Sequence, residues 1–258
     1  MINPNYDFHD LGTRTDDDLE RAIDEGFTFG RYSSNDNDMF LISRDAPTPS
    51  ENEITESVPY MQGVYDFSQL NGGERYFDNR EITYQVMLFE KDYPTRKYAE
   101  QEIKRQLMPL GIQPLYDSHD NGYHWLGKCK SVSVDDDEEK GTLACTVVFD
   151  CYPFAIYNKA EGSDIWDDVY FPHWIFQEAK YTVNGQDVKI ALYNIGSDSV
   201  GAKMNVKGTI TITGDFGTRT LEEGYWVSDP LVLAMGKNEF ILSGKGSIEF
   251  VINREEMI

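Results

Sequence analysis

The sequence has few cysteines, few positive charges and no long apolar run. Its three cysteines, Cys129, Cys145 and Cys151, are odd in number and show no C-x-x-C spacing. This excludes a disulfide scaffold, so reduced thiols in a core are expected. No apolar run approaches the roughly 18 residues that a membrane span needs. The N-terminus also lacks the cationic and apolar segments of an export signal, which predicts synthesis in the cytoplasm and no membrane insertion.

Basic residues are scarce as well: 23 Lys and Arg stand against 45 Asp and Glu, for a net charge of -22 in 258 residues. Such a chain repels a phosphate backbone, so we expect no specific nucleic-acid binding. Most of the excess carboxylates fall in residues 1–155, with 30 acidic against 14 basic residues. The first part of the chain is therefore predicted to carry the acidic surface.

Period-2 alternation dominates what is present and predicts a mainly β protein. The clearest hairpin joins 123–134 to 142–151 around the acidic turn 135–141. If this turn centres near Asp137, Trp125 lies opposite Phe149 and Lys128 projects to the solvent side. The same register places Tyr123 opposite Cys151, Cys129 opposite Cys145, and Lys130 on the solvent side with Lys128. The inward face of the second strand is predicted to carry Leu143, Cys145, Val147, Phe149 and Cys151.

Other elements follow from spacing and capping. A strand is expected over 82–88 with Ile82, Tyr84, Val86 and Leu88 on one face, and both of its faces are expected to be at least half covered. A helix is expected from a Thr95 cap to about Met108, with Ala99, Ile103 and Leu107 as its apolar stripe. A short helix is expected near Thr15 to Gly26. The segment 46–58, with two prolines and several carboxylates, predicts a loop or mobile arm.

A compositional break from Pro153 to Asp168 separates a second set of strands, about a hundred residues long. Turn signals at Asn184-Gly185, Gly214-Asp215 and Gly244-Lys245-Gly246 predict an all-β sandwich there. We therefore expect an N-terminal extension with a short helix over 1–26, a β-rich domain with one helix over 27–157, and a sandwich over 158–258.

No motif of catalysis stands out, and we expect no enzyme, no cofactor and no metal. His119 and His124, with Asp117 and Asp120, form the one candidate metal cluster, but the segment reads as a polar turn that enters a strand. Trp125 matches the inward face of the hairpin. Trp166, Trp174 and Trp226 are candidates for core packing or, in an alternative interpretation, for stacking on sugars.

Several short motifs resemble the distal tail protein (Dit) family of long-tailed, non-contractile phages. They are Tyr60-Met61-Gln62-Gly63-Val64-Tyr65-Asp66-Phe67, Asn79-Arg80-Glu81-Ile82-Thr83-Tyr84 and Phe149-Asp150-Cys151-Tyr152-Pro153. The opening Phe27-Thr28-Phe29-Gly30, Ser33-Ser34 and Met39-Phe40-Leu41-Ile42 is similar to the first hairpin of that family. The resemblance spans 27–157 and rests on the order of these motifs. About 25 residues precede it, and the chain from Asp164 onward matches only in pattern and length.

The resemblance implies a non-enzymatic structural protein of the virion tail tip. It implies a β-rich domain that forms a homohexameric ring with a channel for DNA, and a galectin-like β-sandwich outside that ring. The implied partners are tail tube, tape measure, tail-tip or tail-associated lysin, and receptor-binding or baseplate proteins. Segment 46–58 is a candidate clasp on a neighbouring subunit. The candidate interface residues are Tyr60, Tyr65, Asp66, Phe67, Arg75 and Arg80. The alternative is a carbohydrate-binding module for host cell walls that uses Trp174 and Trp226.

Overall fold

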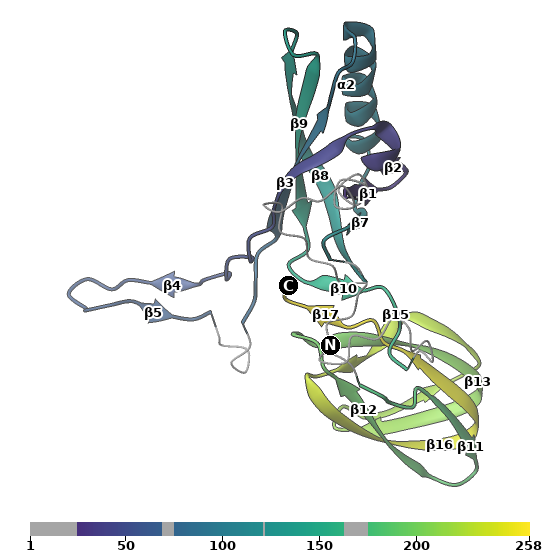
Figure 1. Ribbon diagram of the computed structural model, residues 1–258. Helices are drawn as coiled ribbons and strands as arrows, with labels where there is room; N and C mark the ends of the chain where they lie inside the picture. Colours follow the sequence, from purple (N-terminus) through teal and green to yellow (C-terminus); the bar gives the residue numbers. More distant parts are fainter. Residues whose placement is uncertain (1–24, 69–74, 121, 163–174) are drawn as a thin grey trace, which may run out of the picture. The chain divides into compact units, whose positions relative to one another are not determined.

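The computed structural model describes residues 25–68, 75–120, 122–162 and 175–258. The helix expected near Thr15, together with Trp166 and Trp174, lies outside these residues. The chain divides into two compact units (Figure 1). The N-terminal unit runs to Ala155 and includes Ile258, and the C-terminal unit contains Ile156–Met257. Strands dominate both, so the mainly β prediction is confirmed.

The N-terminal unit is built on one antiparallel sheet in the order β2-β1-β7-β8-β9-β6-β3. β9 pairs antiparallel with both β6 and β8, and the alternating apolar residues of these strands meet on one face. A single turn of 3-10 helix, η1 (Asn35–Asn37), precedes β3. The strands are β1 (Phe27–Phe29), β2 (Tyr32–Ser33), β3 (Phe40–Asp45), β6 (Arg80–Leu88), β7 (Gln113–Asp117), β8 (Tyr123–Asp137) and β9 (Thr142–Cys151).

The helix α2 (Tyr93–Leu107) packs on this sheet and completes the core. Ile103 and Leu107 are fully buried and Ala99 packs beside them, so the predicted stripe is confirmed. The predicted Thr95 cap is wrong: Asp92 caps the helix by accepting a hydrogen bond from the Thr95 amide at 3.2 Å. An Asp one residue before a Tyr-Pro start supplies a better acceptor geometry than a residue already inside the first turn.

The inward faces of β6 and β9 agree with prediction, since Ile82, Tyr84, Val86 and Leu88 are all buried, as is every second residue of β9. The prediction that the opposite face of β6 is half covered holds only for Thr83 and Met87. Gln85 is exposed, and Phe89, one residue past the strand, is 40% exposed.

The hairpin of β8 and β9 has a different register from the one predicted. Cys129 pairs with Phe149, Gly127 with Cys151 and Val134 with Cys145. The tip lies at 138–141, where Gly141 adopts a φ of 64°, so β8 continues through the acidic residues that the sequence suggested as turn. A bulge at Lys130 then turns Val132 and Val134 toward the core. Lys128 lies opposite Asp150.

Within the segment 46–78, β4 (Thr55–Glu56) pairs with β5 (Tyr65–Asp66) as a two-stranded sheet that is separate from the main sheet. We call the described residues 51–68 and 75–77 the arm (Figure 1). The loop predicted over 46–58 is thus one side of a ribbon whose other side carries the Tyr65-Asp66-Phe67 motif.

The C-terminal unit is a sandwich whose two layers share two long strands, β13 (Val200–Gly214) and β16 (Gly236–Val251). The first half of β13 and the second half of β16 lie in one layer, between β15 (Gly224–Leu233) and β11 (Lys180–Asn184). The remaining halves lie in the other layer, between β14 (Gly217–Leu221) and β12 (Val188–Asn194). β10 (Ala155–Tyr157), where the chain leaves the N-terminal unit, pairs with β17 (Glu255–Glu256).

Both long strands pass between the layers at glycines. Gly208, Gly244 and Gly246 have φ values of 81°, 107° and 151°, and a Cβ on Gly246 would lie 2.0 Å from the Lys207 oxygen. The prediction of a turn at Gly244-Lys245-Gly246 is therefore wrong, because the glycines bend one continuous strand. The turns at Asn184-Gly185 and Gly214-Asp215 are confirmed.

Candidate interaction surface

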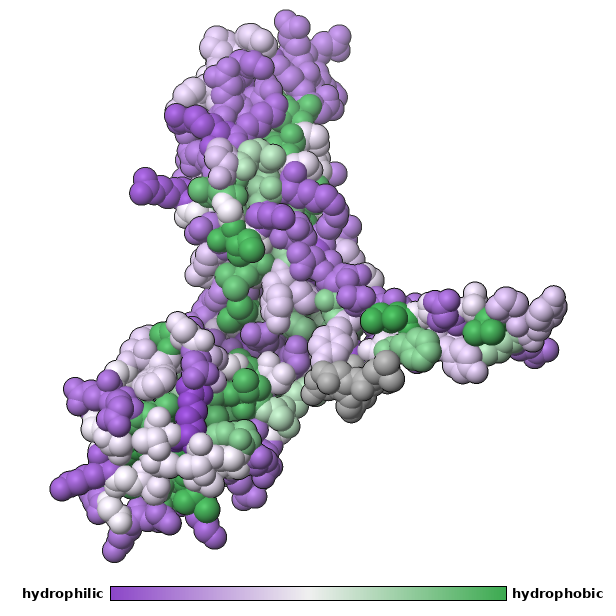
Figure 2. Space-filling view, turned by 180° about the vertical axis from the view of Figure 1, so that it is seen from behind, coloured by the Kyte–Doolittle hydropathy of each residue, from purple (hydrophilic) through white to green (hydrophobic). Residues whose placement is uncertain are grey.

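The arm exposes large apolar side chains that no core element covers. The exposed fractions of Ile54, Val64 and Tyr65 are 59%, 56% and 53%, and Tyr60 at the tip is fully exposed. Figure 2 shows apolar side chains along the arm. A lone two-stranded ribbon is at best marginally stable in water, and contiguous exposed apolar side chains are typical of interaction sites, so the arm is the candidate interaction surface.

Backbone contacts fix the root of the arm. Glu51 and Phe77 form an isolated β-bridge, the Asn52 amide donates to the Tyr76 oxygen at 2.8 Å, and the Asp78 amide donates to the Ser50 oxygen at 2.9 Å. Arg75 adds an ion pair to Glu51 and lies 5.3 Å from the centre of the Phe77 ring. These contacts hold the first residues of the ribbon in register.

The distal part of the arm is ordered by Ser68 and Asp66. The Ser68 hydroxyl accepts from the Ile54 amide at 2.8 Å, and Asp66 accepts from the Ser68 amide at 2.8 Å. The hydrogen bonds from Ser68 lower the pKa of the Asp66 carboxyl. The rings of Tyr65 and Phe67 stack with centres 6.1 Å apart. Tyr60 adopts a φ of 70°, which places it at the tightest point of the tip.

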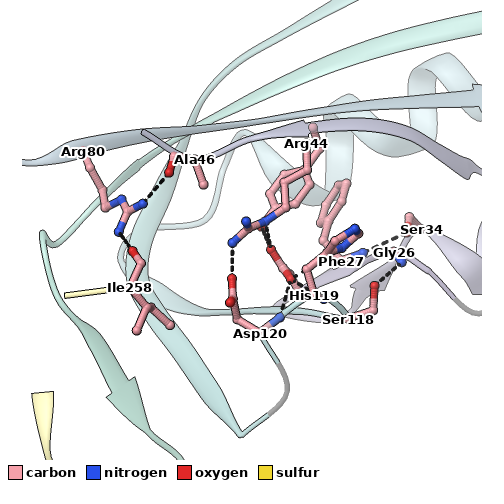
Figure 3. Close-up of polar contacts among 12 residues, drawn as sticks. Gly26, Phe27, Ser34, Arg44, Ala46, Arg80, Ser118, His119, Asp120 and Ile258 are labelled. Atoms are coloured by element: carbon pink, nitrogen blue, oxygen red, sulfur yellow. Dashed lines mark hydrogen bonds and ion pairs between the residues drawn. The ribbon is translucent and has the colours of Figure 1, made fainter. Parts of the chain in front are cut away.

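Two arginines support the strands from which the arm departs (Figure 3). Arg80, at the start of β6, is 2% exposed and donates to the Ala46 oxygen at 2.7 Å and to the Ile258 oxygen at 2.6 Å. Its guanidinium and that of Arg44 both lie over the Trp125 ring, 5.8 and 5.4 Å from the centre. Burial lowers the pKa of Arg80.

Arg44 forms a half-buried network with Asp117 and Asp120 (Figure 3). Asp117 accepts from the Arg44 Nε at 2.5 Å and from the Tyr84 hydroxyl at 2.7 Å. Burial raises the pKa of Asp120, and burial beside Asp117 raises that of Tyr84. The two carboxylates predicted as candidate ligands are thus bound to an arginine. No group of side chains in the described part of the chain could hold a metal ion.

Five of the six candidate interface residues lie on the arm: Tyr60, Tyr65, Asp66, Phe67 and Arg75. Arg80 lies apart from them, beneath the strands at the root. Four further exposed apolar side chains on the arm were not predicted as interface residues, with exposed fractions between 46% and 59%: Ile54, Val58, Val64 and Tyr76. The sequence signal that could have indicated them is the presence of isolated apolar residues in and after a polar segment with two prolines.

The candidate sugar-stacking residue Trp226 is half-buried on β15 and packs against the core of the sandwich. Its indole N–H donates to the Glu222 oxygen at 3.0 Å, and the Arg219 guanidinium lies 5.5 Å from the ring centre. Arg219 in turn pairs with Asp229 at 2.6 Å. Much of the ring is therefore engaged within the unit.

A shallow hollow lies where β8 begins and β9 ends, away from the tip of their hairpin. It is lined by Asn79, Ile112, Leu126, Lys128, Asp150 and Tyr152, with the backbone of Gly127 between them. Ile112 is 69% exposed and Tyr152 is 37% exposed. Lys128 lies 3.5 Å from Asp150, and the neighbouring Lys130 pairs with Glu81. The hollow is thus apolar with a balanced charged rim, and we call these residues the β8–β9 hollow.

Comparison with solved structures identifies the fold. The crystal structure of the SPP1 Dit (gp 19.1) protein, described as a paradigm of the hub adsorption apparatus in phages that infect Gram-positive bacteria, superposes with a TM-score of 0.61. The sequences are 10% identical, and the match covers 89% of this chain and 98% of that chain. No family model and no curated protein sequence matches the chain. None of the described helices is long and apolar enough to cross a membrane.

Proposed function

We propose that this chain is a structural protein of a phage tail tip, a distal tail protein that assembles as a hexameric hub. It joins the tail tube and tape measure protein to tail-tip or tail-associated lysin, baseplate and receptor-binding proteins, and it leaves a channel for DNA. The fold shared with SPP1 Dit supports this role. The galectin-like sandwich decorates the outside of the ring, and the protein is not an enzyme.

The single observation that carries the proposal is the exposed apolar arm. A monomer gains nothing from holding Tyr60, Tyr65 and Ile54 in water at the end of a ribbon. Burial of apolar area is favourable by roughly 25 cal/mol per Å², and these side chains gain this free energy only when another surface covers them. In a self-assembling hub, the arm supplies the contact between neighbouring subunits.

Light scattering on a sizing column, followed by negative-stain imaging, tests this proposal. The expected result is a particle of six times 29.6 kDa with a six-fold ring and an open channel. A protein that stays monomeric at the highest attainable concentration and in the presence of its tail tube partner would contradict it.

The acidity of the N-terminal unit suits a DNA channel, because carboxylates do not hold phosphates and DNA slides past them. We propose that part of this charge faces the channel. Replacing the channel-facing carboxylates with lysines is then expected to slow DNA ejection from assembled virions, measured by dye release. Unchanged ejection would refute this role of the charge.

Carbohydrate binding by the sandwich is the second candidate. Trp226 offers an aromatic face at the surface, and Glu222 and Asp229 lie nearby. Its packing against the core and Arg219 leave less of the ring for a sugar than an open platform would. A tryptophan-fluorescence titration with cell-wall glycans, with Trp226→Phe as the control, separates this candidate from the hub.

A further inference from the structure

We propose that the tip of the arm docks in the β8–β9 hollow of a second copy of this chain. The inference rests on the proposed function and names the two surfaces that would meet in the ring. The donor surface is the arm between Ile54 and Phe67, and the acceptor surface is the hollow around Ile112, Leu126 and Tyr152.

Apolar exposure supports the match. Ile112 is the most exposed aliphatic side chain of the described N-terminal unit, at 69%. It stands beside Leu126 and Tyr152 in the same hollow. The aromatic side chains of the tip, Tyr60 and Tyr65, are of the kind that anchors protein interfaces.

Charge also favours this acceptor. The arm carries Glu51, Glu53, Glu56 and Asp66 and, among its described residues, the single basic residue Arg75. On a chain of net charge -22, most surfaces would repel it. At the hollow, Lys128 and Lys130 balance Asp150 and Glu81. An acidic arm therefore meets no excess of negative charge there.

The occupant must come from another molecule because of the length of the ribbon. The bridge between Glu51 and Phe77 fixes the root, and Tyr60 lies nine residues further along the chain, beyond β4, in the turn at the tip. An extended ribbon spans at most about 3.3 Å per residue, so its tip can lie up to roughly 30 Å from the root. The hollow includes Asn79, two residues past Phe77, so a chain cannot place its own tip there while its root stays paired.

A contact between two different surfaces has a consequence for symmetry. Each copy presents one arm and one hollow, so each subunit can bind two neighbours in the same head-to-tail manner. Such heterologous contacts close into a ring when the rotation per subunit divides a full turn. The same contact that supplies affinity thus also supplies the ring geometry.

Disulfide trapping tests the docking. Native thiols do not interfere, because Cys129, Cys145 and Cys151 are buried and burial raises the pKa of each to about 11 or 12. Tyr60→Cys and Ile112→Cys are made as separate full-length proteins, mixed and mildly oxidised. We expect a disulfide-linked pair that contains one of each variant, and none from either variant alone. Tyr98→Cys, 65% exposed on α2, replaces Ile112→Cys as the matched control.

A second variant measures the same contact without a crosslink. Ile112→Asp places a charge in the hollow and is expected to raise the dissociation constant of assembly at least about tenfold. Tyr98→Asp is expected to leave it unchanged. Circular dichroism and the urea midpoint confirm that both variants fold.

The outcomes separate this inference from the proposed function. If the wild-type protein assembles, but Tyr60→Cys links to Tyr98→Cys as readily as to Ile112→Cys, or to neither, the docking is overturned and the hub stands. If neither assembly nor a crosslink occurs at any concentration, both are overturned. A selective Tyr60–Ile112 link with impaired assembly of Ile112→Asp supports both.

Discussion

At the residue scale, the buried Arg80 and the half-buried Arg44 support the N-terminal unit. Arg80 and Arg44 lie over the same indole and hold the strands from which the arm departs. Arg80, itself 2% exposed, donates part-buried hydrogen bonds to two backbone oxygens. A guanidinium is the side chain that can serve two such acceptors and an aromatic face at once.

Replacing Arg80 with Ala is expected to lower the free energy of unfolding by about 2 to 3 kcal/mol, because it removes two charge-assisted hydrogen bonds and leaves a gap beside Trp125. The midpoint of urea unfolding measures this loss. Arg75→Ala is the control, since the Arg75 side chain is 55% exposed and its ion pair adds little. Equal midpoints for the two variants would show that Arg80 contributes no more to the stability of the fold than the exposed Arg75.

Because of its three buried thiols, the N-terminal unit is expected to lose stability at alkaline pH. In the folded state the pKa of Cys129 is about 11 and those of Cys145 and Cys151 are about 12, against about 8.5 in an unfolded chain. Above pH 9 the unfolded state loses these protons first, so the folded state binds more protons and its stability falls as the pH rises.

We expect the free energy of unfolding to be insensitive to these groups below about pH 8 and to fall by about 4 kcal/mol per pH unit near pH 10, since each thiol contributes about 1.4 kcal/mol per unit. Urea unfolding between pH 7.5 and 10.5 measures the slope. Cys129→Ala should reduce it by about a third. A flat profile over this range would contradict thiols that stay protonated in the fold.

At the scale of elements, the sequence predicted which face of a strand is buried, but not how neighbouring strands are aligned. The alternation in β6 and β9 identified the buried side chains because a period of 2 is local. The register of β8 with β9 depends on which residues of 135–141 form the tip, and six charged residues followed by Gly141 offer several choices. The bulge at Lys130 has no marker in the sequence, and a Gly-x-Gly pattern looks alike at a turn and at a bend.

The candidate interface was partly predictable for the same reason. A family-like motif identified Tyr60, Tyr65 and Phe67, and a polar composition identified the arm. Their pairing was not visible, because strands of two residues, as in β4 and β5, are too short for a periodic signal. The buried position of Arg80 was also hidden, since its partners Ala46 and Ile258 are distant in sequence.

The bends in β13 and β16 should tolerate no side chain. Gly246→Ala would place a methyl group 2.0 Å from the Lys207 oxygen, so we expect a loss of at least about 3 kcal/mol in the C-terminal unit. Gly217 has a φ of 99°, and no atom lies within 4 Å of the position that a methyl group would take. We therefore expect Gly217→Ala to lower the free energy of unfolding by only about 1 kcal/mol. Hydrogen exchange at β13 and β16 amides measures both, and equal effects would rule out the clash.

At the scale of the whole molecule, the arm and the core are energetically separate. No residue between Pro47 and Asn79 belongs to the described core cluster of the N-terminal unit. The stability of the monomer therefore depends on the sheet and α2, and not on the apolar side chains of the arm. In the proposed hub, these side chains serve association, so assembly and folding are expected to change independently.

Replacing residues 53–75 with a short Gly-Ser linker tests that separation. The linker joins Asn52 to Tyr76, whose backbones already meet at 2.8 Å. We expect a folded protein with an unchanged urea midpoint that no longer assembles in light scattering. Retained assembly would show that the arm is not the clasp, and an unfolded product would show that it belongs to the core.

The two shared strands of the C-terminal unit have a mechanical consequence. β13 and β16 run through both layers, so a pulling force cannot detach one layer and leave the other whole. Tension on either long strand is carried across the bend to its partners on both sides. In single-molecule stretching, the sandwich should therefore rupture in one event at one force, and a tail tip that transmits the load of host attachment would gain a joint that either holds or releases entirely.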